Sequence, residues 1–345
     1  MKAMILAGGL STRLYPLTKT VPKPLVPVLG EPNIAHVVRY LKRYGVTEVA
    51  TNVFYFAEDV RGALADGERW GVRLTYLDES ALSGSAGAVK LMQSFLDSEP
   101  FVVIGCDDIT NLNLEALLAF HNERSAIATI GLVERDDVWE YGVVVLDERG
   151  KIVGFQEKPA PGTERSRLVN TGVYVFSQAI FERIPASEVY DFGKQVFPKL
   201  QEDGAAFYGY DAKGAYWCDI GTIGEYRRVT DDLLLGKFAL PGVDPGHRDG
   251  TAQIAADATV AGPVWIGARA SIGSRARVVG PSVISMDVSI EAGADVEHAI
   301  LWPKSHVGSG AVVRNTIVGV SYRVDAGREV IGSVVANESV VQAPG

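Results

Sequence analysis

The strongest constraint on the fold is an apolar residue that recurs at every sixth position in the last third of the chain. The positions are Ile254, Val260, Ile266, Ile272, Val278, Ile284, Ile290 and Val296. Small residues often follow them, as in Ile266-Gly267. This period is typical of a hexapeptide β-helix, where one aliphatic side chain fills each corner of a triangular coil and small residues permit the bends. A β-sandwich is the alternative, but its strands alternate with period two. We therefore predict a left-handed parallel β-helix over residues 253–345.

The first part of the chain alternates short apolar runs with helical patterns. Residues 1–6 form a first strand that ends at Gly8-Gly9, and Asn33 is expected to cap the helix that follows. Further strands are expected at 48–52, 73–77 and 101–105, and helices at 58–66, 86–95 and 114–124. β runs dominate after residue 127, and a helix is expected at 223–235. The pattern predicts an α/β, Rossmann-like domain over residues 1–235 with a mixed, mostly parallel sheet. Its ligands are expected beyond the carboxyl ends of the strands.

Residues 236–252 are rich in proline and glycine and are expected to link the two domains. The 345-residue chain has a formal net charge of −9, which argues against binding to nucleic acid or to anionic membranes. It has two cysteines, which implies no disulfide framework, and no apolar run long enough to span a membrane. We expect a cytoplasmic protein, in which any anionic substrate needs a few cations gathered in one pocket.

Such cations follow the first strand. In Gly8-Gly9-Leu10-Ser11-Thr12-Arg13, glycines let backbone N–H groups approach a phosphate, and the hydroxyls add donors. The loop matches neither a Walker A motif nor G-x-G-x-x-G, and an ordinary strand-to-helix turn is the alternative. Lys23 lies between Pro22 and Pro24, which stiffen the backbone and fix the direction of that cation.

These motifs resemble the signature of the nucleotide-sugar pyrophosphorylases, the sugar-phosphate nucleotidylyltransferases. The resemblance begins with AGGLSTRLYPLT and VPKPLVPV and extends, in the family's order, over roughly residues 1–235. Its other parts are Ser85-Ala86-Gly87-Ala88, the acidic pair after Gly105, Glu157-Lys158-Pro159, Asn170-Thr171-Gly172 and Trp217-Cys218-Asp219-Ile220-Gly221. With its β-helix tail the chain is most similar to the branch that includes the mannose-1-phosphate guanylyltransferases.

The resemblance implies an enzyme that converts a nucleoside triphosphate and a sugar-1-phosphate into a nucleotide sugar and pyrophosphate. Arg13, Lys23 and Asp107 are implied as catalytic residues. The implied nucleotide-binding residues are Leu6, Ala7, Gly8, Gly9, Ser11, Thr12, Arg13, Lys23, Glu79, Gly84, Ser85, Gly87 and Asp107. The implied sugar-phosphate-binding residues are Gly142, Glu157, Lys158, Asn170 and Thr171. Glu157 could instead be a solvated acid at a strand end, and Asn170 a turn-former.

The resemblance also implies Mg²⁺, bound by Asp107 and Asp219. Carboxylates and phosphate oxygens suit this ion, which keeps several waters, so two acids suffice. A capping role is the alternative for Asp107, and alignment of the downstream leucines favours it over Asp108. Three positions depart from the family pattern: Cys106 precedes the metal aspartate where glycine is usual, Ser11 replaces a common glycine, and Asn113 a common aspartate.

Within the family we expect GTP and mannose-1-phosphate as substrates, giving GDP-mannose. A glucose-1-phosphate thymidylyltransferase or a related enzyme is the alternative. A non-catalytic subunit that senses nucleotide sugars is the alternative of another class, and Cys106 leaves it open. The β-helix is expected to serve assembly or regulation in a homo-oligomer, since an exposed coil edge favours pairing.

Overall fold

The computed structural model describes residues 1–9, 11–97, 100–186 and 188–337, which gather into two compact units. The first unit contains residues 1–9 and 34–220, and the second contains residues 11–33 and 221–337. The segment after the first strand is thus grouped with the C-terminal part of the chain. This grouping does not follow the sequence ranges 1–235, 236–252 and 253–345, so that division stays a prediction.

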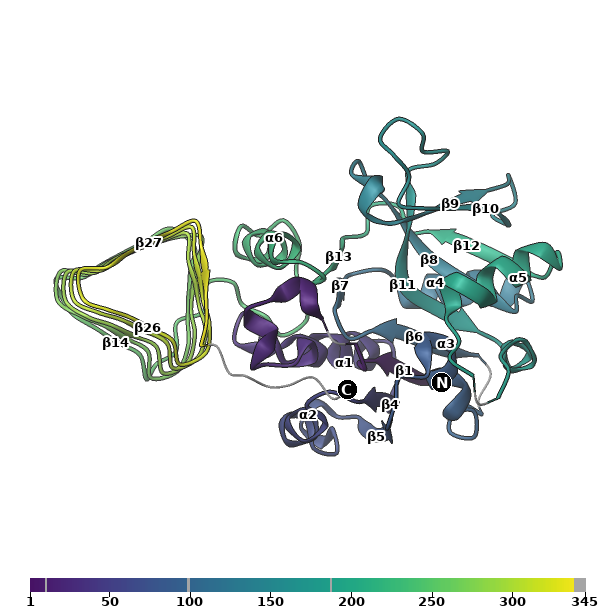
Figure 1. The fold of residues 1–345 in the computed structure, drawn as a ribbon, viewed down its shortest axis with the longest axis horizontal. Helices are drawn as coiled ribbons and strands as arrows, with labels where there is room; N and C mark the ends of the chain where they lie inside the picture. Colours follow the sequence, from purple (N-terminus) through teal and green to yellow (C-terminus); the bar gives the residue numbers. More distant parts are fainter. Residues whose placement is uncertain (10, 98–99, 187, 338–345) are drawn as a thin grey trace. The chain divides into compact units, whose positions relative to one another are not determined.

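The first unit is built on a nine-stranded mixed sheet (Figure 1). Its main path runs β10-β9-β11-β6-β1-β4-β5, and β8 and β12 extend from β11. The parallel half contains β1 (Lys2–Leu6), β4 (Glu48–Val53), β5 (Arg73–Asp78) and β6 (Phe101–Gly105). The other half contains β8 (Ala128–Glu134), β9 (Gly142–Leu146), β10 (Ile152–Glu157), β11 (Leu168–Phe176) and β12 (Phe207–Asp211). Antiparallel pairs dominate there, although β12 pairs with β8 in parallel.

Helices connect these strands. They are α1 (Asn33–Arg43), α2 (Ala57–Leu64), α3 (Gly84–Leu91), α4 (Leu114–Glu123) and α5 (Phe197–Glu202), which a π-helical turn over Phe192–Val196 precedes. The predicted cap at Asn33 is wrong: Asn33 is the first helical residue, and its buried side chain has no hydrogen-bond partner among the described residues. A row of aromatic rings packs the sheet against the α5 region, with ring centroids 4.9 Å apart for Phe176 and Phe192 and 5.1 Å apart for Phe197 and Phe207.

A separate two-stranded ribbon joins distant parts of the first unit. β7 (Asp108–Thr110) pairs antiparallel with β13 (Trp217–Asp219), and Asp108 lies opposite Asp219.

Across the described residues of both units, no helix combines the length and apolarity needed to cross a membrane.

The second unit confirms the predicted β-helix as three five-stranded parallel sheets around a triangular core (Figure 1). The first face contains β14 (Gln253–Ile254), β17 (Ser271–Ile272), β20 (Ser289–Ile290), β23 (His306–Val307) and β26 (Arg323–Val324). The second contains β15 (Thr259–Ala261), β18 (Arg277–Val279), β21 (Asp295–Glu297), β24 (Val312–Arg314) and β27 (Glu329–Ile331). The third contains β16 (Val264–Ile266), β19 (Ser282–Ile284), β22 (Ile300–Leu301), β25 (Ile317–Val318) and β28 (Val334–Val335). The unit also contains α6 (Ile223–Leu234) and the hairpin of β2 (Pro27–Val28) and β3 (Glu31–Pro32).

The six-residue period marks the buried corners except at its start. The six predicted residues from Ile266 to Val296 belong to the coil's buried core, whereas Ile254 is 39% exposed and Val260 is only partly buried. The first coil has a neighbour on one side only, because β14 and β15 pair with β17 and β18 alone. Its aliphatic residues therefore keep contact with solvent.

The alternation of side chains in β24 gives a matched test of the coil core. Val313 points into the core and is fully buried, whereas its neighbour Val312 is only partly buried. We expect Val313→Ala to lower the free energy of unfolding by about 2 kcal/mol, through lost burial and a residual cavity. Val312→Ala should cost under about 1 kcal/mol because little apolar surface is lost. Urea unfolding followed by circular dichroism measures both, and equal losses would contradict the assigned alternation.

Candidate active site

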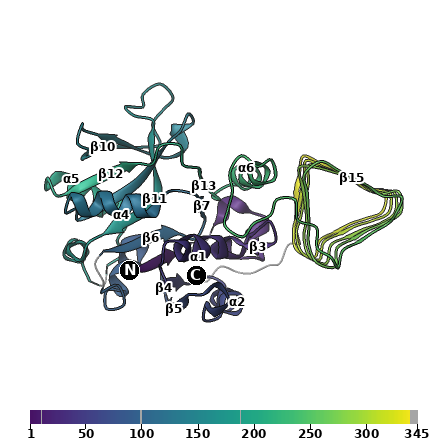
Figure 2. The same cartoon turned by 180° about the vertical axis from the view of Figure 1, so that it is seen from behind.

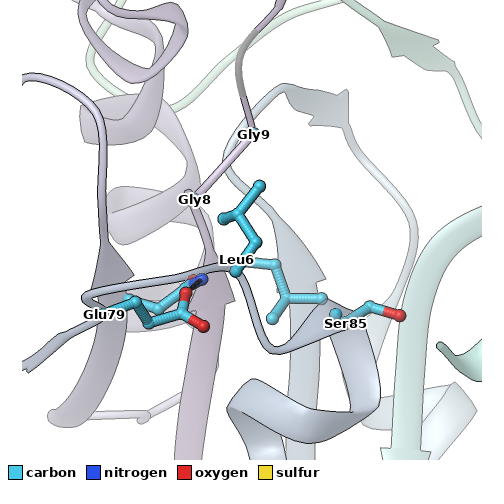
Figure 3. A pocket seen from close by; sticks show the side chains of 8 residues that line it. Leu6, Gly8, Gly9, Glu79 and Ser85 are labelled. Carbon is cyan, nitrogen blue, oxygen red and sulfur yellow. Dashed lines mark hydrogen bonds between the residues drawn. The ribbon is translucent and has the colours of Figure 1, made fainter. Parts of the chain in front are cut away.

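The first unit has a pocket of about 210 Å³ beside the carboxyl ends of β1 and β4 (Figure 3). It lies where ligands are expected in an open sheet of this kind. Leu6 is the last residue of β1, Gly8 and Gly9 follow that strand, and Glu79 follows β5. The full lining is Leu6, Gly8, Gly9, Asn52, Glu79, Leu82, Gly84 and Ser85. Six of these residues were predicted as nucleotide-binding, and the structure brings them together.

A chain of hydrogen bonds fixes the polar wall of this pocket. The Ala7 N–H donates to Asn52 Oδ1 at 2.8 Å, and Asn52 Nδ2 donates to Glu79 Oε2 at 2.5 Å. The Ser83 N–H and hydroxyl both donate to Glu79 Oε1. Hydrogen bonds from Asn52 and Ser83 therefore hold the Glu79 carboxylate in one orientation.

Gly8 is required by this arrangement. An ideal Cβ at Gly8 would lie 2.6 Å from Asn52 Nδ2 and 3.0 Å from Glu79 Oε2, whereas a Cβ at Gly9 would meet nothing within 4 Å. The two adjacent glycines therefore differ: the first allows close packing against the Asn52–Glu79 pair, and the second lies beside open space.

The start of α3 closes another side of the pocket. Gly84 has φ +79°, and a Cβ there would lie 2.5 Å from the Tyr190 carbonyl oxygen. That oxygen accepts hydrogen bonds from the N–H groups of Ala86 and Gly87, both at 2.9 Å. The Gly87 N–H is therefore engaged inside the protein, and Gly87 lines a different hollow together with Lys90 and Val189. Gly87 is therefore absent from the lining of the Glu79 pocket, and its contact with the nucleotide stays a prediction.

Two carboxylates follow β6, the strand next to β1. In the parallel register of β1 and β6, Leu6 is paired with Gly105, and the Cys106 N–H donates to the Leu6 carbonyl at 3.0 Å. Asp107 and Asp108 follow immediately. A Cβ at Gly105 would lie 2.7 Å from Asp107 Oδ1 and 2.6 Å from Asp108 Oδ2. The absence of a side chain at Gly105 therefore makes room for both carboxylates.

Asp108 has a structural role. It is 6% exposed and accepts hydrogen bonds from the Gly105 N–H at 2.9 Å and from Trp217 Nε1 at 3.0 Å. Burial, and then the charges of Asp107 and Asp219, raise its pKa well above the usual value. Asp107 and Asp219 are only half-buried. The Asp107 carbonyl accepts from the Ile220 N–H at 3.0 Å, which joins the two acidic segments.

The donor set at this place fits a hard divalent cation that completes its shell with other oxygens. The half-buried carboxylates Asp107 and Asp219 both raise the pKa of the buried Asp108, and the negative charge that they bring together favours a bound cation. No group of three or more His, Cys, Asp or Glu in residues 1–9, 11–97, 100–186 and 188–337 could enclose an ion by itself. An ion bound here by Asp107 and Asp219 would need phosphate oxygens and water.

The predicted sugar-phosphate residues lie on β9, β10 and β11. Gly142 is paired with Glu157 across β9 and β10, and a Cβ at Gly142 would lie 3.4 Å from Glu157 Oε2. Lys158 has φ 45°, and its N–H donates to the Tyr141 carbonyl at 3.1 Å, so the chain turns just after Glu157. Glu157 is the last residue of β10, a position that is compatible with sugar binding and with a solvated acid at a strand end.

Asn170 and Thr171 lie at an irregularity in the pairing of β11 with β8. Asn170 Nδ2 donates to the Tyr174 hydroxyl at 3.1 Å, and its Oδ1 accepts from the Gly172 N–H at 3.0 Å. Thr171 is fully buried, donates to the Gly131 carbonyl at 2.7 Å and accepts from the Val173 N–H. The Thr171 hydroxyl is therefore engaged within the sheet, and the role of Thr171 in sugar-phosphate binding stays a prediction.

The loop cations belong to the second unit. Ser11 adopts the left-handed conformation (φ 54°, ψ 41°) that favours glycine, which gives a physical reason for the family's glycine at this position. Thr12 and Arg13 begin a 3-10 turn over Thr12–Leu14 and are exposed. Lys23 begins another 3-10 turn, over Lys23–Leu25, and is half-buried.

The sequence reasoning missed two structural supports of the pocket. Asn52 is the penultimate residue of β4, the strand next to β1, and a polar residue near that end was a usable signal, because the carboxyl ends of parallel strands meet at one edge. Asp191 accepts from the Ser85 N–H and hydroxyl at 3.2 Å. It lies 106 residues away in the sequence, so no local pattern indicated it.

The two adjacent glycines allow a direct test of the pocket geometry. We expect Gly8→Ala to lower the free energy of unfolding by about 1–3 kcal/mol, because it displaces Asn52 from buried hydrogen bonds. Gly9→Ala should stay within about 0.5 kcal/mol of the original protein. Thermal unfolding without nucleotide measures both, and a Gly8→Ala protein as stable as Gly9→Ala would contradict the Asn52–Glu79 wall.

The chain is similar to known proteins along most of its length. The nucleotidyl transferase family model matches residues 2–235, and the GMPPB C-terminal domain model matches residues 249–344. A UTP–glucose-1-phosphate uridylyltransferase from Synechocystis is 35% identical, covering 94% of this chain and 89% of that protein. A mannose-1-phosphate guanylyltransferase from Mycobacterium tuberculosis is 32% identical, covering 86% and 82%.

A crystal structure from Bacillus anthracis, assigned as a glucose-1-phosphate thymidylyltransferase in complex with sucrose, superposes with a TM-score of 0.59 at 28% identity. It covers 67% of this chain and 94% of that one. The family match over residues 2–235, with relatives aligned along most of both chains, shows that this chain belongs to the nucleotidyl transferase family as a sugar-1-phosphate nucleotidylyltransferase.

Proposed function

We propose that the protein transfers guanylate from GTP to mannose-1-phosphate, forming GDP-mannose and pyrophosphate. The observation that carries the reaction type is the pairing of Leu6 with Gly105. With this pairing, Leu6 of the Glu79 pocket and the segment that contains Asp107 lie at the ends of adjacent strands, and Asp219 lies opposite Asp108, which supports the proposal. The similarity to the Mycobacterium tuberculosis guanylyltransferase and the GMPPB-type tail support the choice of substrates.

In the proposed reaction an oxygen of the sugar phosphate attacks the α-phosphorus of the nucleotide. A new P–O bond forms as the bond from the α-phosphorus to the bridging oxygen breaks, and pyrophosphate leaves with that electron pair. Mg²⁺ bound by Asp107 and Asp219 would supply charge neutralisation at the α-phosphate. Because two polyanions must meet, positioning and neutralisation provide most of the catalysis.

The remaining roles are assigned to residues of this chain. The pocket from Leu6 to Ser85 holds the nucleoside, with the fixed Glu79 carboxylate as an acceptor. Arg13 and Lys23 neutralise the triphosphate and the departing pyrophosphate. Lys158 neutralises the sugar phosphate, and Glu157 and Asn170 accept or donate to sugar hydroxyls. Gly142 leaves space beside Glu157.

A second candidate is the transfer of uridylate to glucose-1-phosphate. The similarity to the Synechocystis uridylyltransferase favours it, since that relative covers 94% of the chain. Single hydroxyl and amino contacts decide between such substrates. We also propose a homo-oligomer in the cytoplasm, which is supported by the exposed edge at the first coil and by the low cysteine count.

A screen for pyrophosphate release tests the proposal. Purified protein with Mg²⁺ is given each common nucleoside triphosphate with mannose-, glucose-, N-acetylglucosamine- or galactose-1-phosphate. We expect the highest kcat/KM with GTP and mannose-1-phosphate. A preference for UTP and glucose-1-phosphate would select the second candidate. No release from any pair would instead favour a nucleotide-sugar-sensing subunit.

The metal assignment has its own test. We expect Asp107→Asn and Asp219→Asn each to lower kcat by about a hundredfold or more, because the ion loses a charged ligand. Asp97→Asn is the control, since this acid is exposed and pairs with Lys2. Removal of the metal with a chelator should abolish turnover in all proteins. Near-normal rates in either test variant would show that the metal is bound elsewhere.

A further inference from the structure

One face of the β-helix carries apolar side chains on its outside. In β16, β19, β22 and β25, the inward residues alternate with an outward series in register: Trp265, Val283, Ile300 and Ile317. Val283, Ile300 and Ile317 are at most 3% exposed although they point away from the coil core. The second face differs, because its outward residues include the ion-paired Arg277, Asp295 and Arg314. The third face is therefore suited to be covered by other parts of the chain.

Within the second unit, α6 and the segment 11–33 are bonded to this region. Trp302, which directly follows β22, is 1% exposed, and its indole Nε1–H donates to the Tyr226 hydroxyl at 2.9 Å. The Tyr226 hydroxyl donates in turn to the Pro27 carbonyl at 2.6 Å. Figures 1 and 2 both show the segment that contains Pro27, drawn in purple, beside α6. Tyr226 is fully buried, and burial raises its pKa, so the hydroxyl keeps the proton that it donates.

Three further contacts join the β2–β3 hairpin and α6 to the β-helix. A Cβ at Gly30, in the hairpin turn between β2 and β3, would lie 2.2 Å from the Trp265 ring, so the turn lies directly against the outer face of β16. Arg227 Nη1 donates to the His298 carbonyl at 3.1 Å. His298 Nε2 lies 2.8 Å from Asp231 Oδ2, one helical turn further along α6.

Pro27, whose carbonyl accepts the hydrogen bond from Tyr226, lies four residues after Lys23. The Leu25 N–H donates to the Pro22 carbonyl at 2.8 Å and the Val26 N–H to the Lys23 carbonyl at 3.1 Å, so residues 22–26 form one tight turn. The Asn33 N–H donates to the Val26 carbonyl at 2.9 Å and closes the base of the hairpin. Two prolines further restrict this turn. A displacement at Pro27 is therefore transmitted to Lys23 over a short and stiff path.

We propose that Tyr226 and Trp302 are positioning residues for the reaction: through the Pro27 carbonyl they hold the Lys23 turn on the β-helix. The β-helix thereby sets the place of a cation that neutralises the triphosphate. This inference rests on the proposed function for the role of Lys23. The coupling itself rests only on the contacts within the second unit.

The test uses the full-length protein with Tyr226→Phe and Trp302→Phe. Each change removes one hydrogen-bonding group of the relay and keeps an aromatic ring. Tyr40→Phe is the matched control, because the buried Tyr40 hydroxyl also donates to a backbone carbonyl, that of Leu112, at 2.9 Å. All proteins are assayed well below their unfolding temperatures.

We expect both test variants to lower kcat/KM for the nucleoside triphosphate by about tenfold, with KM for the sugar-1-phosphate within about twofold of the original. Tyr40→Phe should leave both within about twofold. A role in general stability would instead affect both substrates alike. Equal losses for the two substrates, or an unchanged kcat/KM for the triphosphate, would overturn the proposal.

Hydrogen exchange provides a readout that does not need activity. The amides of Leu25, Val26 and Asn33 should exchange about tenfold faster in Tyr226→Phe than in the original protein or in Tyr40→Phe, because the turn and hairpin open more often. If the original protein releases no pyrophosphate with any substrate pair, the proposed function fails. Exchange then decides the coupling alone: faster exchange supports it, and unchanged exchange overturns it.

Discussion

The pairing of β1 with β6 is the constraint on which the site in the first unit depends. One parallel ladder fixes Leu6 opposite Gly105, so the pocket wall and the acidic segment begin at the same level of the sheet. Glycines on both strands then allow close approach: Gly8 allows Asn52 and Glu79 to pack, and Gly105 allows two carboxylates to turn back beside the strand. Neither arrangement requires a long loop, because strand register places the groups.

The position of a few cations matters more in this protein than its net charge. A protein with a net charge of −9 that handles two polyanions needs its cations close to the reacting groups. The acidic cluster makes this need greater, since Asp108 is buried beside two further carboxylates. In the proposed function the positive charge comes from a divalent ion, from Lys158 and from the loop cations Arg13 and Lys23. The loop cations are placed by a segment that packs with the second unit.

Periodic and local features of the structure could be predicted from the sequence, and long-range ones could not. The six-residue period gave the coil corners from Ile266 onward but failed at Ile254, because a sequence period does not show which coil ends the stack. The resemblance identified most of the pocket. It did not indicate that Gly87 and Thr171 are engaged by Tyr190 and Gly131, which lie far away in the sequence. Asp108 shows the same limit, because its partner Trp217 is 109 residues away.

The bond between Tyr226 and the Pro27 carbonyl joins residues 199 positions apart, and this separation affects how the protein matures. During synthesis the Lys23 turn leaves the ribosome long before α6 and the coil exist. Closing so large a loop costs chain entropy, which is recovered only when the outer apolar face of the β-helix is complete. A nascent chain that has already formed its β1–β4–β6 sheet therefore still lacks the support for its signature turn. The turn can take its final place only after α6 and the coil as far as Trp302 have been made.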